Sequence, residues 1–220
     1  SDLGLDQIEE SDNVIKIGAM CTLRQIEECE ALKELYGDGI AESVRHIVGV
    51  QFRYQATVGG SIYGRFGFSD VLTAFLALDT FVELYNGGTI RLSEFVNRKP
   101  DKDILLSVIV RKSKRKFRYE SIRQTKTDFP VIACSVVTGM VHGKETWYFS
   151  VGARPMKAAL LEKQWEIPDH ASEEMIAEYA RQAASEFTYG TNMRGSAEYR
   201  RHLAEVLIRR EMSSILAEGR

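Results

Sequence analysis

The 220-residue chain is poor in the residues that form cross-links and metal sites. Its three cysteines, Cys21, Cys29 and Cys134, are odd in number, widely separated and without Cys-x-x-Cys spacing. This pattern argues against a disulfide framework, a zinc site or an iron–sulfur cluster within the chain. We expect free thiols in a reducing compartment and therefore a cytoplasmic protein.

Histidine is equally scarce. The four histidines, His46, His142, His170 and His202, lack metal-ligand spacing, and we interpret each as a surface or core residue. No nucleophile-elbow pattern surrounds a serine, and no cysteine has a recognisable activated setting. We therefore predict no metal ligand and no catalytic side chain.

The chain also lacks an excess of either charge and a long apolar run. Its 29 basic and 31 acidic side chains leave a net charge of −2, which favours neither nucleic acid nor an anionic membrane. No apolar run approaches the roughly 20 residues of a membrane helix, and the N-terminus is not signal-like. The basic run at 111–116 (RKSKRK) has no aromatic platform, so we interpret it as a hairpin tip or linker. Nucleic-acid binding through this run is kept as a third hypothesis.

The segment Thr57–Asp70 (TVGGSIYGRFGFSD) is the most informative part of the chain. Its glycines lack a Cβ, so their backbone N–H groups can approach a bulky anion such as a phosphate. An apolar helix over 71–78, capped by Ser69 or Asp70, would place a helix N-terminus beside this loop. From the glycines alone, an irregular surface loop is an equal alternative.

The hydrophobic patterning predicts an α+β fold in two parts, 1–112 and 113–220. In the first part, Thr22 and Gln25 form a capping box for a helix, and Ile40, Val44, Ile47 and Val48 form a helical stripe. A hairpin is expected around the Asn-Gly-Gly turn at 86–88.

The second part is expected to be an antiparallel sheet with helices on one face. Its predicted elements are strands over 132–140 and 147–151, a helix with the stripe Met175, Ile176, Tyr179, Ala183 and Phe187, and a last helix with the stripe Tyr199, Leu203, Val206 and Leu207.

Three segments resemble signatures of one family. Ile17–Leu23 (IGAMCTL) is similar to an Ile-Gly-Ala-x-x-Thr-Leu element, Gln51–Ile62 (QFRYQATVGGSI) to a Gln-Ile-Arg-Asn-x-Ala-Thr-Ile-Gly-Gly-Asn-Ile loop, and Arg194–Arg201 (RGSAEYRR) to an Arg-x-Ser-x-x-Tyr-Arg element. The chain resembles the FAD-binding (flavoprotein) subunit or domain of the xanthine dehydrogenase family of molybdenum hydroxylases. It departs from the family pattern at Ser61, which replaces Asn, and at 63–68 (YGRFGF), which replaces an Ala-x-Ala-Ser-Pro-like stretch.

The resemblance implies a vanillyl-alcohol-oxidase-like FAD-binding subdomain followed by the C-terminal α+β domain of the flavoprotein subunit. FAD is the implied cofactor, with the glycine loop at its pyrophosphate and ribityl chain, Asp70 at sugar or ribityl hydroxyls, and a cation near the isoalloxazine ring, where it would favour the reduced flavin. The implied cofactor-binding residues are Thr57, Gly59, Gly60, Ser61, Ile62, Tyr63, Ser69, Asp70, Leu105 and Arg123.

The resemblance also implies a function and partners. The chain would transfer electrons from the iron–sulfur centres of a small subunit, supplied by a molybdenum-cofactor large subunit, through FAD to NAD or another acceptor. Relatives carry a first glycine loop with a Gly-Gly-Thr core, which would lie before Ser1, so we expect this chain to hold one side of a two-loop site. The alternative is a non-catalytic assembly or scaffold module of the same fold that does not retain FAD.

Overall fold

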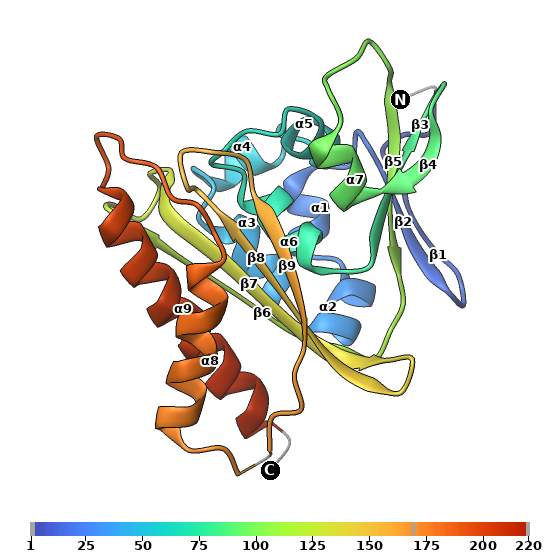
Figure 1. Cartoon of the computed structure of the whole chain (residues 1–220). Helices are drawn as coiled ribbons and strands as arrows, with labels where there is room; N and C mark the ends of the chain where they lie inside the picture. The colour runs from blue at the N-terminus through green and yellow to red at the C-terminus, as the bar shows by residue number, and fades with distance from the viewer. Residues whose placement is uncertain (1–2, 169, 219–220) are drawn as a thin grey trace.

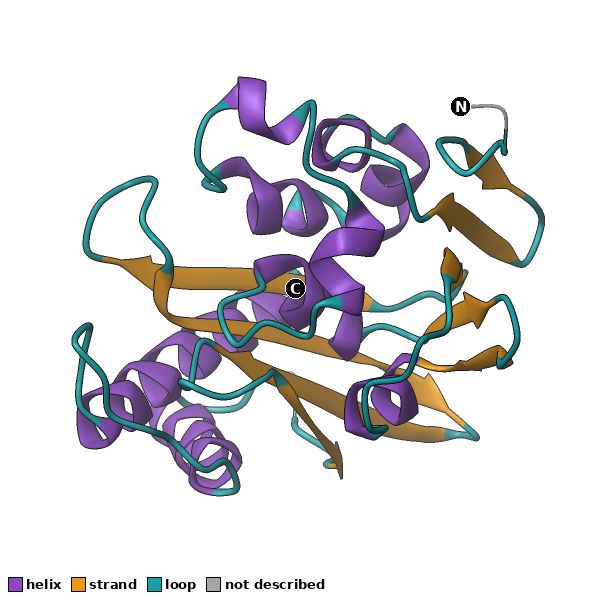
Figure 2. Ribbon diagram, turned by 90° about the horizontal axis from the view of Figure 1, so that it is seen from above, coloured by secondary structure: helices purple, strands orange, loops and turns teal. Residues whose placement is uncertain are grey.

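The computed structural model describes residues 3–168 and 170–218, which form two antiparallel sheets with helices between and outside them. Figure 1 shows the five-stranded sheet on one side, a layer of short helices next to it, the four-stranded sheet, and the two longest helices on the far face. Figure 2 shows the same layers from above. This arrangement confirms the predicted α+β class.

The five-stranded sheet has the order β1-β2-β5-β3-β4, and every neighbouring pair is antiparallel. Its strands are β1 (Ile8–Glu10), β2 (Val14–Gly18), β3 (Thr80–Leu84), β4 (Gly88–Arg91) and β5 (Leu105–Arg111). The predicted hairpin is present as β3 and β4. Gly88 has a φ of +64°, a conformation that glycine adopts without the steric cost of a Cβ.

Short helices fill the space next to this sheet, and their starts follow the expected capping chemistry. They are α1 (Leu23–Glu27), α2 (Glu30–Tyr36), α3 (Gly39–Arg45), α4 (Val50–Arg53), α5 (Val58–Tyr63), α6 (Asp70–Ala77) and α7 (Leu92–Asn97). Thr22 and Gln25 form the predicted capping box of α1, and the Ser69 side chain caps α6. All eight residues of α6 are buried, as its apolar sequence predicts.

The predicted stripe through Ile47 and Val48 runs past the end of α3, which stops at Arg45. Val48 has a φ of +51° and is 51% exposed, so the chain turns away from the helix there. Both residues instead line a cavity described below.

The second sheet has the order β6-β7-β8-β9, again fully antiparallel. Its strands are β6 (Lys116–Arg123), β7 (Pro130–Val141), β8 (Lys144–Gly152) and β9 (Ala159–Gln164), and the helices α8 (Glu173–Ser185) and α9 (Ala197–Ala217) follow. The prediction of helices on one face was incomplete, because α6 packs on one face of this sheet and α9 on the other. Residues 130–138 of β7 are therefore buried without alternation.

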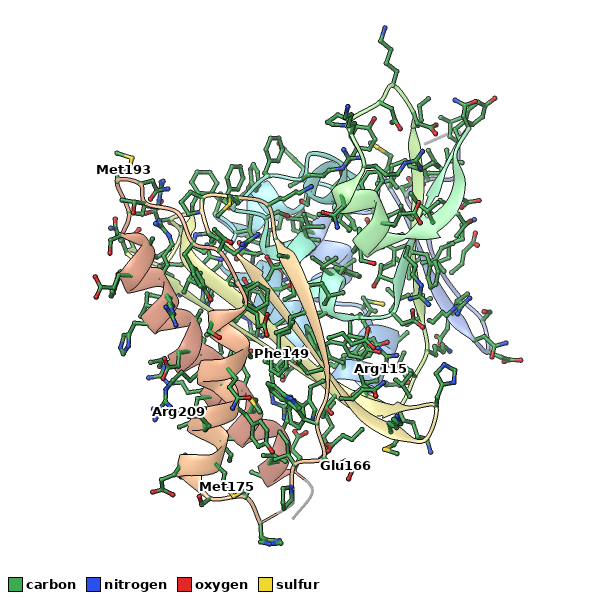
Figure 3. All side chains as sticks on the ribbon, viewed as in Figure 1. Arg115, Phe149, Glu166, Met175, Met193 and Arg209 are labelled. Carbon is green, nitrogen blue, oxygen red and sulfur yellow. The ribbon has the colours of Figure 1, made fainter. Side chains whose placement is uncertain are left out.

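The buried stripe of α9 differs from the predicted one. Tyr199 is 48% exposed, whereas Arg200 and Glu211 are 1% exposed and lie among the helix's buried apolar residues. Figure 3 shows Phe149 between this sheet and the helix pair, and Arg209 and Met175 on the outer side of the helices. Because Arg200 and Glu211 lie on the buried face, the pattern of apolar residues alone did not identify this face.

The basic run lies at the linker between β5 and β6 and makes contacts within the chain. Lys112 Nζ lies 2.6 Å from Glu10 Oε1, Lys116 donates to the carbonyl of Ile215, and the Arg115 guanidinium lies over the Tyr148 ring. This position agrees with the linker interpretation. The division at residues 112 and 113 stays a prediction, because the first core cluster also includes residues of β6 and β7.

Two further features of the described residues are the state of their cysteines and the hydropathy of their helices. Cys21, Cys29 and Cys134 are free thiols. Among residues 3–168 and 170–218, no helix combines the length and the hydropathy needed to cross a bilayer.

Candidate cofactor site

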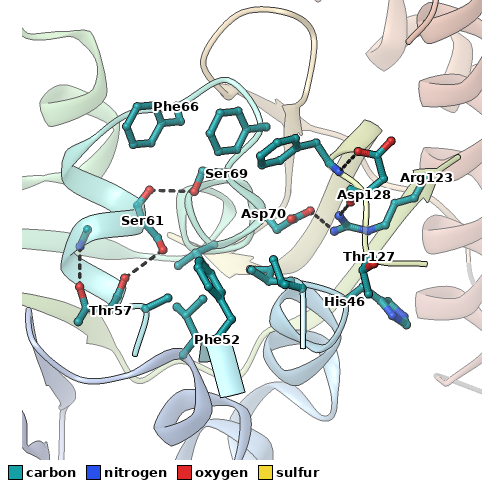
Figure 4. Close-up of a pocket in the computed structure, with 18 residues that line it drawn as sticks. His46, Phe52, Thr57, Ser61, Phe66, Ser69, Asp70, Arg123, Thr127 and Asp128 are labelled. Carbon is teal, nitrogen blue, oxygen red and sulfur yellow. Dashed lines mark hydrogen bonds and ion pairs between the residues drawn. The ribbon is translucent and has the colours of Figure 1, made fainter. Parts of the chain in front are cut away.

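A cavity of about 540 Å³ opens where the helix layer meets the end of the second sheet. Figure 4 shows Thr57 and Ser61 at one side of it, Arg123 and Asp128 at the other, and Phe66 across from Phe52. Six of the predicted cofactor-binding residues line it: Thr57, Gly60, Ser61, Ser69, Asp70 and Arg123.

The glycine pair forms the start of α5, and its backbone donors are already used. Thr57 caps the helix by accepting from Gly60 N, and Ser61 N donates to the Thr57 carbonyl. Val58 N and Gly59 N donate to the carbonyls of the β2–α1 connection. In this arrangement the four N–H groups of residues 58–61 bind protein acceptors, so they do not form the open phosphate cradle that the sequence suggested.

The other four predicted residues lie outside the cavity lining. A Cβ on Gly59 would lie 2.5 Å from the Ala19 carbonyl oxygen, so this glycine allows α5 to pack against the β2–α1 connection. Ile62 is fully buried, and Leu105 is 7% exposed within β5. The Tyr63 hydroxyl donates to backbone carbonyls of the loop at 101–103. A contact of these four with a cofactor stays a prediction.

Ser69 and Asp70 begin α6 and connect it to α5. The Ser69 hydroxyl donates to the Ser61 carbonyl at 2.8 Å and accepts from Leu72 N at 3.1 Å. Asp70 follows as the first residue of the helix, where the positive end of the helix dipole stabilises a carboxylate. Ser69 therefore holds the start of α6 against α5.

Asp70 forms a buried ion pair with Arg123 of β6, with 2.7 Å between Oδ1 and Nη2. The Tyr119 hydroxyl, also on β6, donates to the same carboxylate oxygen. Burial raises the pKa of Asp70, and the nearby Arg123 cation opposes that rise. Burial also raises the pKa of Tyr119, and the adjacent Asp70 carboxylate adds to it. The pair fastens the start of α6 to the edge of the second sheet.

Arg123 also joins the loop between β6 and β7 to this cluster. Its Nη1 donates to the Asp128 carbonyl at 2.5 Å, while Asp128 Oδ1 accepts from Arg194 Nη2 at 3.2 Å. Arg123 Nε has no hydrogen-bond partner among the described residues, and Arg123 lines the cavity. The Nε atom is itself buried, so this donor is unsatisfied and is not exposed to the open cavity.

The sequence did not identify the rest of the cavity lining. His46, interpreted as an isolated histidine, lies in the lining, and its Nδ1 has no partner among the described residues. Phe52, Phe66, Phe68 and Phe129 contribute half-exposed aromatic rings. Phe66 and Phe68 belong to the stretch that departs from the family pattern. No local signal marks His46 or Phe129, because their position depends on the tertiary fold.

These features define a class of protein. The cavity is mostly apolar, contains a few polar groups, and lies beside the glycine-containing start of α5. Such a cavity is typical of a site for an organic cofactor. Its volume lies within the range of such sites.

Two family models cover the chain. The FAD binding domain in molybdopterin dehydrogenase matches residues 1–112, and the CO dehydrogenase flavoprotein C-terminal domain matches residues 117–215. The chain therefore belongs to the family of FAD-binding flavoprotein subunits and domains of molybdenum hydroxylases, which confirms the resemblance seen in its sequence. FAD is the cofactor of this family and of this chain.

The chain is also similar to a curated relative and, in its fold, to solved structures. The protein YgfM of Escherichia coli (strain K12), whose function is uncharacterised, is 25% identical over 211 residues, which cover 94% of this chain and 75% of YgfM. Quinoline 2-oxidoreductase from Pseudomonas putida 86 is 16% identical with a TM-score of 0.81, covering 97% of this chain and 79% of that chain.

Two carbon monoxide dehydrogenases are similar in the same way. The enzyme from Hydrogenophaga pseudoflava is 18% identical, covering 97% of this chain and 78% of that chain, with a TM-score of 0.81. The enzyme from Oligotropha carboxidovorans is 21% identical, covering 97% and 79%, with a TM-score of 0.81. At these identities the likeness shows the shared fold.

The residues present fit the flavin part of FAD. The aromatic and aliphatic side chains of the lining suit a flat ring system. Thr57, Ser61 and Ser69 bring hydroxyl groups to the lining, where the Ser61 and Ser69 hydroxyls already donate to the carbonyls of Thr57 and Ser61. The paired N–H groups of α5 are the feature that does not match the expected pyrophosphate contact.

Proposed function

We propose that this chain is an FAD-binding electron-transfer subunit, or part of one, in a xanthine dehydrogenase-like molybdenum hydroxylase. Its partners would be a molybdenum-cofactor large subunit and an iron–sulfur small subunit. Electrons would arrive from the iron–sulfur centres and leave to NAD or another acceptor, while the oxidised substrate binds elsewhere in the complex. When bound, FAD supplies the redox chemistry.

The cavity is the observation that carries this proposal. It is lined by residues from both family-matched segments, with Ser61 and Asp70 from the first and Arg123 and Asp128 from the second. The buried Asp70 to Arg123 pair fixes these segments together, and the mostly apolar lining would exclude water from a ring bound there. In this proposal the side chains bind and orient the cofactor and do no acid–base work on the hydroxylated substrate.

Flavin content tests the proposal directly. We expect the purified chain to bind FAD stoichiometrically after reconstitution, with the visible absorption of a flavoprotein. Gly60→Val adds a branched side chain at the cavity lining, and Asp70→Asn removes the carboxylate, so both should lower FAD occupancy at least tenfold. Asp79→Asn is the matched control, because Asp79 also pairs with an arginine but lies outside the cavity lining.

Far-UV circular dichroism separates loss of cofactor from loss of fold in each variant. Unchanged flavin occupancy in both folded cavity variants would refute the assignment of this cavity. The alternative, a scaffold module that does not retain FAD, is favoured by the protein-bonded N–H groups of α5. It predicts a colourless chain that cannot be reconstituted.

A further inference from the structure

A second cavity, of about 220 Å³, adjoins the larger one, and the rings of Phe68 and Phe129 line both. We call it the arginine cavity. The start of β7, the β8–β9 connection, the α8–α9 loop and the first turn of α9 supply most of its other lining residues: Pro130, Ala153, Pro155, Asn192, Arg194 and Arg200. Among the described residues, this lining includes two arginines and no acidic side chain.

The charge of Arg200 has no counter-charge within the fold. Its side chain is 1% exposed, so the guanidinium is removed from water. All of its hydrogen bonds go to neutral acceptors, which are the carbonyls of Val131, Gly190 and Gly195 and the side-chain oxygen of Asn192. These acceptors satisfy the donors but do not neutralise the charge. A buried charge without an opposite charge is costly, so a bound anion would stabilise this position.

Arg194 adds a second positive charge to the same cavity. Burial lowers the pKa of Arg200, and the nearby Arg194 cation lowers it further, because like charges disfavour each other. Asp128 is the carboxylate that pairs with Arg194, at 3.2 Å. Both arginines also lie near the start of α9, where the dipole of a 21-residue helix contributes further positive potential. The cavity therefore has an excess of positive charge.

Arg194 and Asn192 are the groups that a ligand can contact. Of the Arg194 side chain, 27% is exposed, and Asn192 is also exposed, whereas the buried Arg200 would act through its electric field. The Asn192 side-chain oxygen accepts from Arg194 N and from Arg200, which leaves its amide nitrogen as a donor without a partner among the described residues. Arginine and amide N–H groups are typical donors to a carboxylate.

The remaining walls of the cavity are apolar and already ordered. The Phe68 and Phe129 ring centroids lie 4.2 Å apart, and the Arg194 guanidinium lies over the Phe129 ring, 5.3 Å from its centre. Asp128 Oδ1 accepts from Phe129 N at 2.7 Å. Such a surface suits a flat apolar group. The volume is smaller than the roughly 300–1,000 Å³ of sites for drug-sized ligands, which indicates a ligand with a single ring.

We propose that the arginine cavity binds a small organic carboxylate, with the carboxylate at Arg194 and Asn192 and an apolar ring against Phe68 and Phe129. The proposal does not depend on FAD binding, because neither Arg194 nor Asn192 lines the larger cavity. The ligand would supply the negative charge that the surroundings of Arg200 lack.

The test uses the full chain without added FAD and isothermal titration calorimetry at constant ionic strength. Three probes are compared: benzoate, benzamide, which has nearly the same shape without the charge, and inorganic phosphate, which has the charge without the ring. We expect benzoate to bind with a Kd of about 1 mM or below. Benzamide and phosphate should each bind at least about tenfold more weakly.

Two variants should change benzoate binding in opposite directions. Arg194→Met removes the contacting cation and should weaken binding at least about tenfold. Asp128→Asn keeps an acceptor for Phe129 N but removes the competing carboxylate, so benzoate should bind about threefold more tightly. Arg201→Met is the matched control, because it removes the same charge from an exposed position on α9 outside the lining.

Three results would overturn the proposal: no benzoate binding to the folded wild type, equal binding of benzoate and benzamide, or equal benzoate affinity of the wild type and of an Arg194→Met variant that far-UV circular dichroism shows to be folded. Phosphate binding as tight as that of benzoate would overturn the organic ligand and indicate an inorganic anion. A chain that binds benzoate as expected but cannot bind FAD would refute the proposed function and leave this proposal intact.

Discussion

Asp70 on α6 and Arg123 at the end of β6 are 53 residues apart in the chain, yet they form an ion pair at 2.7 Å in which both side chains are less than a tenth exposed. The pair joins the segment that matches the FAD-binding domain to the segment that matches the flavoprotein C-terminal domain. It also includes Arg123, the residue that the family resemblance predicts to lie near the flavin. The site and the junction between the two segments therefore depend on the same contact.

Removing one member of this pair should be costly. Asp70→Ala leaves the Arg123 charge buried without its partner, and we expect a loss of about 3–5 kcal/mol in the free energy of unfolding, measured by urea titration. Asp70→Ala/Arg123→Met removes both charges and should recover part of that loss. Asp79→Ala breaks a pair whose arginine is 60% exposed and should cost about 1 kcal/mol or less. A double variant no more stable than Asp70→Ala would contradict this account.

The adjacent glycines 59 and 60 should respond differently to the same substitution. A Cβ at Gly59 would meet the Ala19 backbone at 2.5 Å, so Gly59→Ala should destabilise the fold by about 1–3 kcal/mol. At Gly60 the nearest atom is Thr57 Oγ1 at 3.1 Å, and alanine is the better helix former, so Gly60→Ala should be close to neutral. Thermal and urea unfolding measure both. Equal losses would contradict the close packing of Gly59 against Ala19.

Local signals in the sequence were sufficient for much of the fold. Thr22 with Gln25, Ser69 before an apolar run, and the Asn-Gly-Gly turn each specify a short element through chemistry within a few residues, and each is present. The packing of α6 between two sheets was not predicted. A helix that is apolar on every side indicates burial but does not indicate which surfaces bury it.

The candidate site was predicted only in part, because local signals in the sequence do not show which distant residues meet in the folded chain. The motif around Thr57 and the resemblance at Arg123 identified residues that meet at one cavity, whereas His46 and Phe129 reach it through tertiary structure alone. On α9, the burial of Arg200 is tolerated because its guanidinium donates to the carbonyls of Val131 and Gly190 and to Asn192. Hydrophobic periodicity cannot anticipate a buried arginine that is satisfied by distant acceptors.

Glu211 on α9 should make the stability of the fold depend on pH. It is 1% exposed, and neither carboxylate oxygen has a hydrogen-bond partner among the described residues. Burial raises its pKa well above the ordinary value, and Glu120 on β6 adds to the rise, while Arg118 on the same strand opposes it. Cys134 on β7 is also near, with a raised pKa of its own.

The direction of this pH dependence follows from the linkage between protonation of Glu211 and folding. A carboxyl whose pKa is higher in the folded state contributes stability that is fully present below its unfolded pKa, near 4.5, and is lost as the pH rises toward the folded value. Between pH 5 and 8 this one group should lower the free energy of unfolding by up to about 1.4 kcal/mol per pH unit. Glu211→Gln keeps the shape and removes the titration, so its advantage over the wild type should grow with pH.

Urea titrations at several pH values measure the difference in the free energy of unfolding between Glu211→Gln and the wild type. The contributions of other titrating groups cancel in this difference. Glu205→Gln is the control, because it replaces a carboxylate on the same helix at a position where a third of the side chain is exposed. An advantage of Glu211→Gln that stays constant from pH 5 to 8 would mean that Glu211 titrates as it does in water. In that case the carboxyl must reach solvent through motion of α9 against β6 and β7, and the buried position would describe only part of the folded ensemble.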